Sequence, residues 1–144
     1  MTTVYSPQAK SWSPARESDA GNVQGVIGYH PGTATAWAQD DVVQMVKIPS
    51  GATVMDCVLE TGALGSNVLA SVGDGLGGTT ARYITAQSVA SAAVLRKNAV
   101  AAAGVPFTYA AEDTIDVVLS NANPTDNIAI RLDVFYICGV DNTP

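Results

Sequence analysis

Residues 73–78, with the sequence G-D-G-L-G-G, are the stretch whose composition and spacing most suggest ligand chemistry. They satisfy the pattern G-x-G-x-x-G, in which glycines let a pyrophosphate approach the backbone at the start of a helix. A dinucleotide site of this kind also needs a preceding strand, a helix that begins within the glycines, and an acidic residue about 20 positions later. Each requirement can be checked in the sequence.

Only the strand requirement is met. Residues 68–72 (VLASV) suit a strand, but residues 79–85 (TTARYIT) are β-branched and aromatic and show no helical apolar stripe. No Asp or Glu occurs between Asp74 and Glu112, and no Gly-Lys-Ser/Thr follows the glycines as in a Walker loop. The sequence therefore predicts a glycine-rich turn and no nucleotide cofactor, with Asp74 bonding its own backbone rather than a metal.

The remaining candidate catalytic groups are sparse. His30 is the only histidine and lacks a G-x-S-x-G elbow, so we expect a surface or turn histidine. One histidine cannot supply a cupin-type metal site, and the calcium pattern D-x-D-x-D-G is absent. The acidic pairs at positions 40–41 and 112–113 stand where strands are expected to begin, which is ordinary for solvated charge. We predict that the protein is not an enzyme and carries no metal or cofactor.

The two cysteines, Cys57 and Cys138, are too few for a disulfide framework and too far apart for a zinc knuckle. Both lie in segments that resemble strands. We expect buried free thiols, and a disulfide between them only if the two strands face each other.

Composition favours a single domain of packed β-sheets for the 144 residues. Hydrophobic residues make up 47% of the chain but aromatic residues only 6%, so small and β-branched side chains must fill most of the core. Charged residues are 14%, against about 25% in an average soluble domain. We therefore expect part of the surface to be covered by self-association.

Charge and hydropathy disfavour two classes of partner. The net charge is −6, and the seven basic residues are scattered, so nucleic-acid binding is not expected. The first residues show no basic segment followed by an apolar stretch, and no apolar run is long enough for a membrane span. We expect neither secretion by a signal peptide nor insertion into a membrane.

Alternating apolar residues predict strands along most of the chain. Residues 23–29 form one predicted strand, and residues 42–48 and 53–60 resemble a hairpin around a proline-glycine turn. Residues 53–60 alternate Met55, Cys57 and Leu59 against acidic positions. Residues 113–120 and 127–138 are predicted to be an antiparallel pair with one buried face each. Residues 86–104 fit either a short helix or strand and loop, and the nearby turn signals favour strand and loop.

The first 22 residues lack a sustained period and predict an extended N-terminal arm, which leaves residues 23–144 as the β-sandwich domain. Tyr5 and Trp12 are isolated aromatic residues that could anchor the arm to a partner, and Arg16 could pair with acidic groups. Fully extended, 22 residues reach about 70 Å. For Trp37 an interface role and a role in the core both stay open.

Residues 41–56, DVVQMVKIPSGATVMD, resemble a stretch of small virion proteins of tailed bacteriophages with the pattern D-V-v-x-l-x-k-i-P-x-G-a-x-v-x-d. The likeness continues through residues 72–75 (VGDG), 82–84 (RYI) and 109–117 (YAAEDTIDV). It covers about residues 23–140, and the family it resembles is that of the head decoration, or cement, proteins.

This resemblance implies a jelly-roll-like antiparallel β-sandwich, usually a homotrimer, that sits on the outer surface of the capsid. The implied partner is the major capsid protein, and the implied location is the virion exterior after synthesis in the host cytoplasm. No nucleic acid, membrane or small-molecule substrate is implied. Two alternatives remain: a tail or fibre component, and a carbohydrate-binding β-sandwich module. The second would show aromatic side chains on one sheet face, but the aromatic residues are dispersed: Tyr29, Trp37, Tyr83 and Tyr109.

Overall fold

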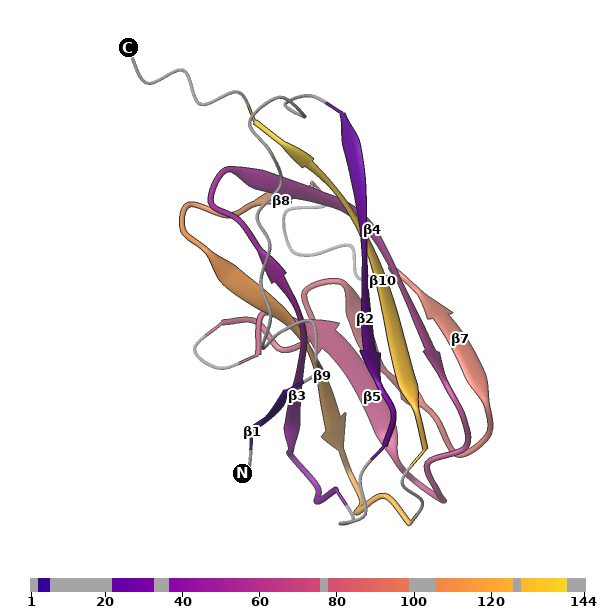
Figure 1. Cartoon of the computed structure of the whole chain (residues 1–144). Helices are drawn as coiled ribbons and strands as arrows, with labels where there is room; N and C mark the ends of the chain where they lie inside the picture. The colour runs from indigo at the N-terminus through magenta and orange to yellow at the C-terminus, as the bar shows by residue number, and fades with distance from the viewer. Residues whose placement is uncertain are drawn as a thin grey trace.

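The computed structural model describes residues 3–5, 22–32, 37–75, 78–98, 106–125 and 128–139, and these residues form two β-sheets (Figure 1). Sheet A contains, in spatial order, β1 (Thr3–Tyr5), β3 (Val42–Ile48), β9 (Asp113–Ser120), β5 (Leu69–Gly73) and β6 (Ile84–Ser88). Sheet B contains β2 (Val23–His30), β10 (Ile130–Cys138), β4 (Ala52–Thr61) and β7 (Ala93–Arg96), and the short β8 (Phe107–Thr108) also pairs with β4. The described residues include no helix long and apolar enough to cross a membrane.

The strand order is that of a jelly roll. Strands β2, β4, β7 and β10 lie in sheet B, while β3, β5, β6 and β9 lie in sheet A, so the chain crosses between the layers repeatedly. Every described pairing is antiparallel except that of β1 with β3. Eight strands in two sheets with such crossings make the double-sheet jelly roll. The predicted fold class is confirmed.

Two predicted strand pairs are wrong. β3 and β4 are joined by a three-residue turn at 49–51, yet β3 pairs with β9 and β4 pairs with β10. β9 and β10 likewise lie in different sheets. A short turn between two strands, each with one buried face, suits a hairpin and a crossing between layers equally well, because both place the apolar faces inward. The true hairpin joins β5 and β6.

The core lies between the sheets and is filled by the predicted alternating residues. Ile115, Val117 and Leu119 of β9 are fully buried, and so are Leu132 and Val134 of β10. The inward faces of both strands therefore agree with the sequence pattern.

Met55 is the exception to this alternation, because its side chain is 40% exposed. The register of β10 against β4 shifts between Phe135, which is opposite Asp56, and Tyr136, which is opposite Val54. Met55 is thus the extra residue of a β-bulge, which turns its side chain away from the face of Cys57. The prediction that Met55 faces the core is wrong for this reason.

Two segments that the sequence leaves open are partly described. Residues 93–96 form β7, as the strand-and-loop interpretation of residues 86–104 predicts, and residues 99–105 lie outside the described residues. Residues 3–5 form β1, which pairs in parallel with β3 in the register Thr3 to Val42. The start of the predicted arm therefore adds an edge strand to sheet A. Residues 6–21 lie outside the described residues, so the domain boundary at residue 22 stays a prediction.

The close approach of β2 to β3 yields a test of the packing. A Cβ atom at Gly28 would lie 2.8 Å from the Met45 carbonyl oxygen, whereas a Cβ at Gly25 would lie 3.5 Å from the Phe135 ring in ordinary contact. Gly28→Ala should lower the free energy of unfolding by about 1–3 kcal/mol through overpacking. The matched variant Gly25→Ala should be neutral or raise it by up to about 1 kcal/mol. Urea denaturation measures both, and equal effects would contradict this close approach of the two sheets.

Candidate functional site

The glycine-rich loop at residues 73–78 connects β5 to β6 as part of a hairpin. The Asp74 N–H donates to the Thr79 carbonyl at 3.0 Å, and the chain returns as an antiparallel strand instead of a helix. Gly75 has a φ of +57°, and a Cβ there would overlap the Asp116 carboxylate. A Cβ at Gly73 would overlap the Thr79 carbonyl. The glycines serve the packing of a turn, and the predicted turn is confirmed.

The Asp74 carboxylate is held by two side chains rather than by its own backbone, which corrects the prediction. It forms an ion pair with Arg82 Nε and accepts a hydrogen bond of 2.6 Å from the Tyr109 hydroxyl. The Tyr109 and Tyr83 hydroxyls are 2.8 Å apart, and the Arg82 guanidinium lies 3.6 Å from the centre of the Phe107 ring. Burial raises the pKa of both tyrosines, so they stay protonated. This network ties the loop to residues 107–109 and leaves no free base.

Asp116 is a buried carboxyl on the central strand β9. Its exposed fraction is 0%, and neither oxygen has a hydrogen-bond partner in the described part of the chain. Burial raises its pKa to about 7; the nearby charges of Asp113 and Asp74 act in the same direction, and the neighbouring Thr114 opposes them. Because Gly75 packs directly over the carboxylate, no substrate can reach it.

The two acidic pairs lie at opposite ends of β3. Val42 is opposite Val118 and Ile48 is opposite Asp113, so the seven residues of β3 separate the pairs by about 20 Å. Glycosidase carboxylates lie within roughly 5–9.5 Å of each other. The pairs therefore cannot act on one substrate.

The environments of the two pairs also differ. Asp41 is buried instead of solvated as predicted, and its Oδ2 accepts the Ala38 N–H at 2.8 Å. Glu112 is exposed, as expected, and forms a 3.8 Å ion pair with Lys47. Asp41 and Glu112 thus each have a partner that holds the chain at one end of β3.

His30 and Trp37 form an edge-to-face aromatic pair with ring centres 5.3 Å apart. His30 is only 5% exposed and its Nδ1 accepts the Gly32 N–H at 3.2 Å. Of the predicted surface or turn histidine, the surface alternative is therefore wrong, since the residue is buried at the end of β2. Trp37 is 2% exposed and joins the core cluster. Of the two roles left open for Trp37, the structure gives it the one in the core, which leaves it unavailable as a surface anchor.

The cysteines carry thiols and no disulfide. Cys57 is opposite Val134, and Cys138 is opposite Ala52, so the two are not paired across the strands. Burial, and then the charge of Asp56, raises the pKa of Cys57 to about 12, which makes this thiol unreactive at neutral pH. Cys138 is only half-buried, less than predicted. No group of three metal-binding side chains occurs within the described ranges.

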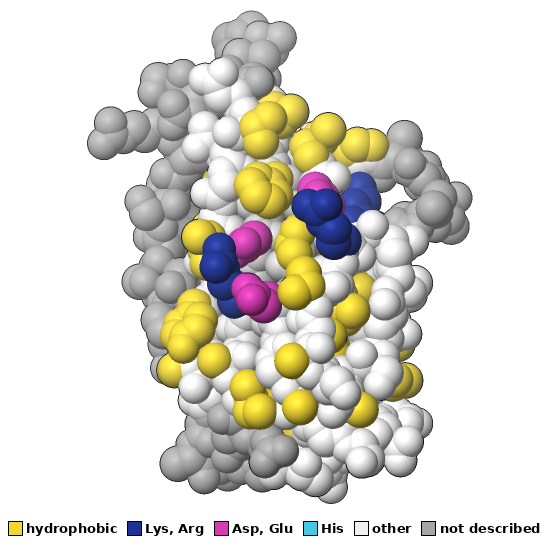
Figure 2. All heavy atoms as spheres, turned by 90° about the vertical axis from the view of Figure 1, so that its right-hand side faces the viewer, with side chains coloured by type: hydrophobic (Ala, Val, Ile, Leu, Met, Phe, Trp, Pro, Cys, Tyr) yellow, Lys and Arg dark blue, Asp and Glu magenta, His cyan; other side chains and the backbone are white. Residues whose placement is uncertain are grey.

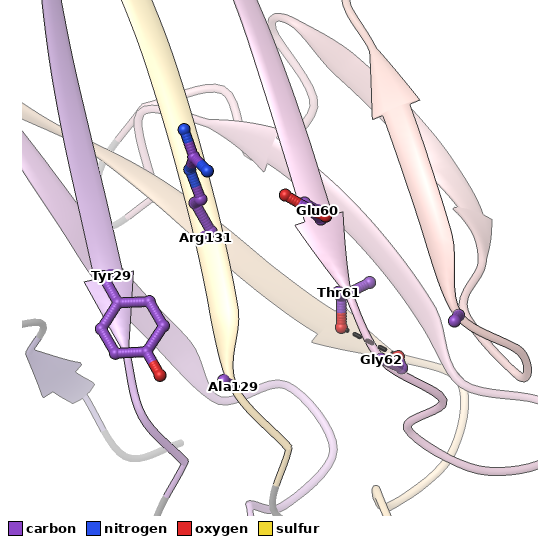
Figure 3. Close-up of a pocket in the computed structure, with 7 residues that line it drawn as sticks. Tyr29, Glu60, Thr61, Gly62, Ala129 and Arg131 are labelled. Carbon is purple, nitrogen blue, oxygen red and sulfur yellow. Dashed lines mark hydrogen bonds between the residues drawn. The ribbon is translucent and has the colours of Figure 1, made fainter.

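One open depression, with a volume of about 370 Å³, lies where β2, β10 and β4 run side by side (Figure 3). Two of its polar side chains are already engaged: Arg131 forms hydrogen bonds of 2.8 and 3.0 Å to Asp133, and the Thr61 hydroxyl donates to the Gly62 carbonyl. Tyr29 supplies the aromatic part of the lining. Because these groups are paired and do not converge on one point, the depression lacks the features of an active site.

The outer face of sheet B is the best candidate for a functional surface. All six large hydrophobic side chains that are known to be exposed in the described part of the chain lie on this sheet: Val23, Ile27, Tyr29, Met55, Val94 and Phe135. Figure 2 shows this face, with hydrophobic side chains spread across it and basic and acidic side chains in two mixed groups. Exposed apolar side chains gathered on one face of the molecule are typical of an interaction surface. We define the apolar face as the outward-facing residues of β2, β10, β4 and β7.

Sequence reasoning missed this surface, although β2 carried a signal for it. Val23, Ile27 and Tyr29 point outward while Val26 points toward the core, so β2 is apolar on both sides. A strand without polar alternation indicates that both of its faces are covered.

The predicted contact residues do not form a described site. Tyr5 lies in β1, and Trp12 and Arg16 lie outside the described residues. Trp37 is in the core.

Comparisons with known proteins give the fold and no family. No family model and no curated protein matches the chain. A chain in the capsid of Ralstonia phage GP4 matches with a TM-score of 0.78 and 18% identity, over 96% of this chain and 99% of that one. A chain in the cyanophage Pam1 capsid asymmetric unit matches with a TM-score of 0.65 and 23% identity, over 92% and 96%. The acidic stable capsid structure of Helicobacter pylori bacteriophage KHP30 contains a further match, with a TM-score of 0.50, 21% identity and coverage of 79% and 86%.

The hairpin geometry of the glycine-rich loop predicts that the protein does not bind nucleotides. Isothermal titration calorimetry with ATP and with NAD should give no saturable heat, because no helix N-terminus faces the loop in the described part of the chain. Saturable binding with a micromolar constant to either compound would show that the loop is a phosphate site after all.

The burial of Asp116 predicts an unusual dependence of stability on pH. Its folded-state pKa of about 7 lies above the value of 3.8 for a free side chain, so its contribution is complete below pH 4 and is lost as the pH rises through 7. The free energy of unfolding should fall by up to about 4 kcal/mol over that range. Asp116→Asn should remove most of this slope, while the exposed control Glu112→Gln should keep it. Urea denaturation at several pH values measures the slope, and an unchanged slope in Asp116→Asn would refute the assignment.

Proposed function

We propose that this protein is a structural component of a tailed-phage virion, which binds the outer surface of the capsid as a decoration protein and stabilises the mature shell. The observation that carries the proposal is the nearly end-to-end match to a chain in the capsid of Ralstonia phage GP4. Coverage is almost complete on both sides, so the two chains have nearly the same length. The match therefore extends over the whole sandwich and is not confined to one part of it.

The chemistry of the described residues supports a binding role without catalysis. The carboxylate of Asp74 is neutralised by Arg82, and that of Asp116 is sealed beneath Gly75. A protein of this kind acts through contact area. If it binds the expanded shell and not the precursor, it stabilises the expanded shell by mass action.

The positions of the aromatic residues do not favour the carbohydrate-binding alternative. Trp37, Tyr83 and Tyr109 are buried, so they offer no platform for a sugar ring. Tyr29 on β2 and Phe135 on β10 are exposed on the same face, but Tyr29 is opposite Arg131, four residues from Phe135, so the two rings do not form a continuous platform. A virion role is the better explanation of this distribution.

The proposed assembly is a homotrimer seated on the major capsid protein, formed after synthesis in the host cytoplasm. Tyr5 and Trp12 are the proposed aromatic anchors of the arm, and Arg16 is the proposed partner for acidic groups on the shell. Trp37 is left out of this set because it is buried. No nucleic acid, membrane or cofactor takes part.

The direct test is binding to purified capsids. The protein should co-sediment saturably with expanded, mature shells and not with precursor shells, and imaging of virions should place it on the capsid exterior. Density on the tail or fibres instead would favour the alternative virion role, and absence from the particle would end the proposal.

The arm makes a separate prediction. Trp12→Ala should weaken capsid binding by on the order of 2 kcal/mol, roughly thirtyfold, if Trp12 is a hot spot. The neighbouring variant Ser11→Ala serves as the control and should bind normally. A point change is preferable to deletion of residues 1–20, since deletion also removes β1 from the edge of β3. Equal binding of Trp12→Ala and the parent protein would show that the arm does not anchor.

A further inference from the structure

We propose that the apolar face of sheet B packs against a second copy of this chain. The proposal goes beyond the proposed function by naming a surface for a contact between two copies. It does not depend on capsid binding, because the contact can be measured on the free protein.

The first argument is the uneven distribution of apolar surface between the two sheets. The exposed fractions on sheet B reach 65% for Val94, 62% for Val23 and 50% for Ile27. Phe135 on the central strand β10 and Tyr29 on the edge strand β2 join them on the same side. Strands β3, β9, β5 and β6 of sheet A carry no exposed large hydrophobic side chain. Burial of this face against a partner is favourable, because it removes the exposed apolar side chains from water.

The second argument is the size of the face. Strands lie about 4.8 Å apart and rise about 3.4 Å per residue, so four strands of about eight residues cover roughly 20 by 27 Å. Side chains roughen this surface, so its accessible area exceeds the flat area of roughly 500 Å². A stable interface buries about 800 Å² on each partner. The face therefore supplies more than half of the area that one partner buries in a stable interface, and two sheets can pack face to face at about 10 Å.

The third argument is charge, and it selects a second copy as the occupant. The apolar face holds three acidic residues, Asp56, Glu60 and Asp133, and the basic residues Arg96, Lys97 and Arg131 lie on it or at its margin. The other described residues carry six acidic side chains against two basic ones, but Asp41, Asp74 and Asp116 are buried, so three acidic and two basic side chains remain at the surface.

Two copies that met through any acidic part of the surface would place like charges together. The apolar face is balanced instead, with Arg131 opposite Glu60 across the strands and beside Asp133 along β10. A face with both signs interspersed can be complementary to itself across a two-fold axis, in a contact between two chains that is distinct from the three-fold contacts of the proposed homotrimer. A strongly basic or acidic partner would gain nothing from such a balanced surface.

The test uses the full chain, free in solution, with lysines placed on the apolar face. Ile27→Lys and Val94→Lys lie on the two edge strands of sheet B at exposed positions, so the fold should tolerate them. Ala86→Lys, at an exposed position on β6 of sheet A, is the matched control. Each lysine brings the net charge of −6 nearer to zero, so a loss of association cannot come from greater overall repulsion.

Sedimentation velocity and light scattering over a wide range of concentration should give an oligomer for the parent protein and for Ala86→Lys. The double variant should sediment as a monomer with an unchanged circular dichroism spectrum. If the double variant fails to fold, Val94→Lys alone should still weaken association at least tenfold.

A parent protein that is monomeric at every concentration would overturn the proposal, and so would a double variant that keeps the parent mass. A monomeric parent whose double variant no longer binds capsids would assign the face to the capsid protein instead. A self-association that disappears in the variant, without any binding to capsids, would support this inference and refute the proposed function.

Discussion

A two-layer sandwich buries only the inward faces of its sheets, so each outer face has to be covered by the chain's own loops, by water or by a partner. The two sheets of this protein meet that constraint differently. On sheet A the loop after β5 folds back until Gly75 packs on Asp116, so the chain covers part of its own surface. On sheet B, Ile27, Val94 and Phe135 stay exposed. This difference between the faces, rather than any cleft, determines what the molecule can do.

The described polar groups are bound to one another and are not arranged around an open pocket. An active site needs polar groups that converge on an open pocket and have donors or acceptors free to bind a substrate there. Here the Asp74 carboxylate is saturated by Arg82 and Tyr109, and Arg131 is paired with Asp133 on an open surface. The two carboxylate oxygens of Asp116 have no hydrogen-bond partner among the described residues, but they are buried beneath Gly75. Polar groups that stabilise loops are consistent with a protein whose proposed role is to bind a partner over a large surface.

The sequence is sufficient to predict which residues of a strand face the core. It is insufficient to predict which strands pair with each other. Alternation places Ile115 and Leu132 correctly, because a period of two is a local property of one strand. It cannot decide whether β3 and β4 pair, since a hairpin and a crossing between layers bury the same residues. It also misplaces Met55, because a bulge depends on the partner strand β10. The burial of His30 could not be predicted from the sequence, because Trp37, which packs against it, is seven residues later in the chain. The apolar face is visible in the sequence only in β2, whose two sides are both apolar.

The parallel pairing of β1 with β3 changes what the arm can reach. A free arm of 22 residues would extend about 70 Å, but Tyr5 is fixed to the edge of β3 and Asn22 lies directly before β2. Trp12 is seven residues from Tyr5, so its backbone stays within about 25 Å of the end of β1. Residues 6–21 join β1, at the edge of sheet A, to β2, at the edge of sheet B, so an anchor at Trp12 acts within reach of both edges. The arm and the apolar face therefore involve neighbouring parts of the surface, and a contact at one constrains a contact at the other.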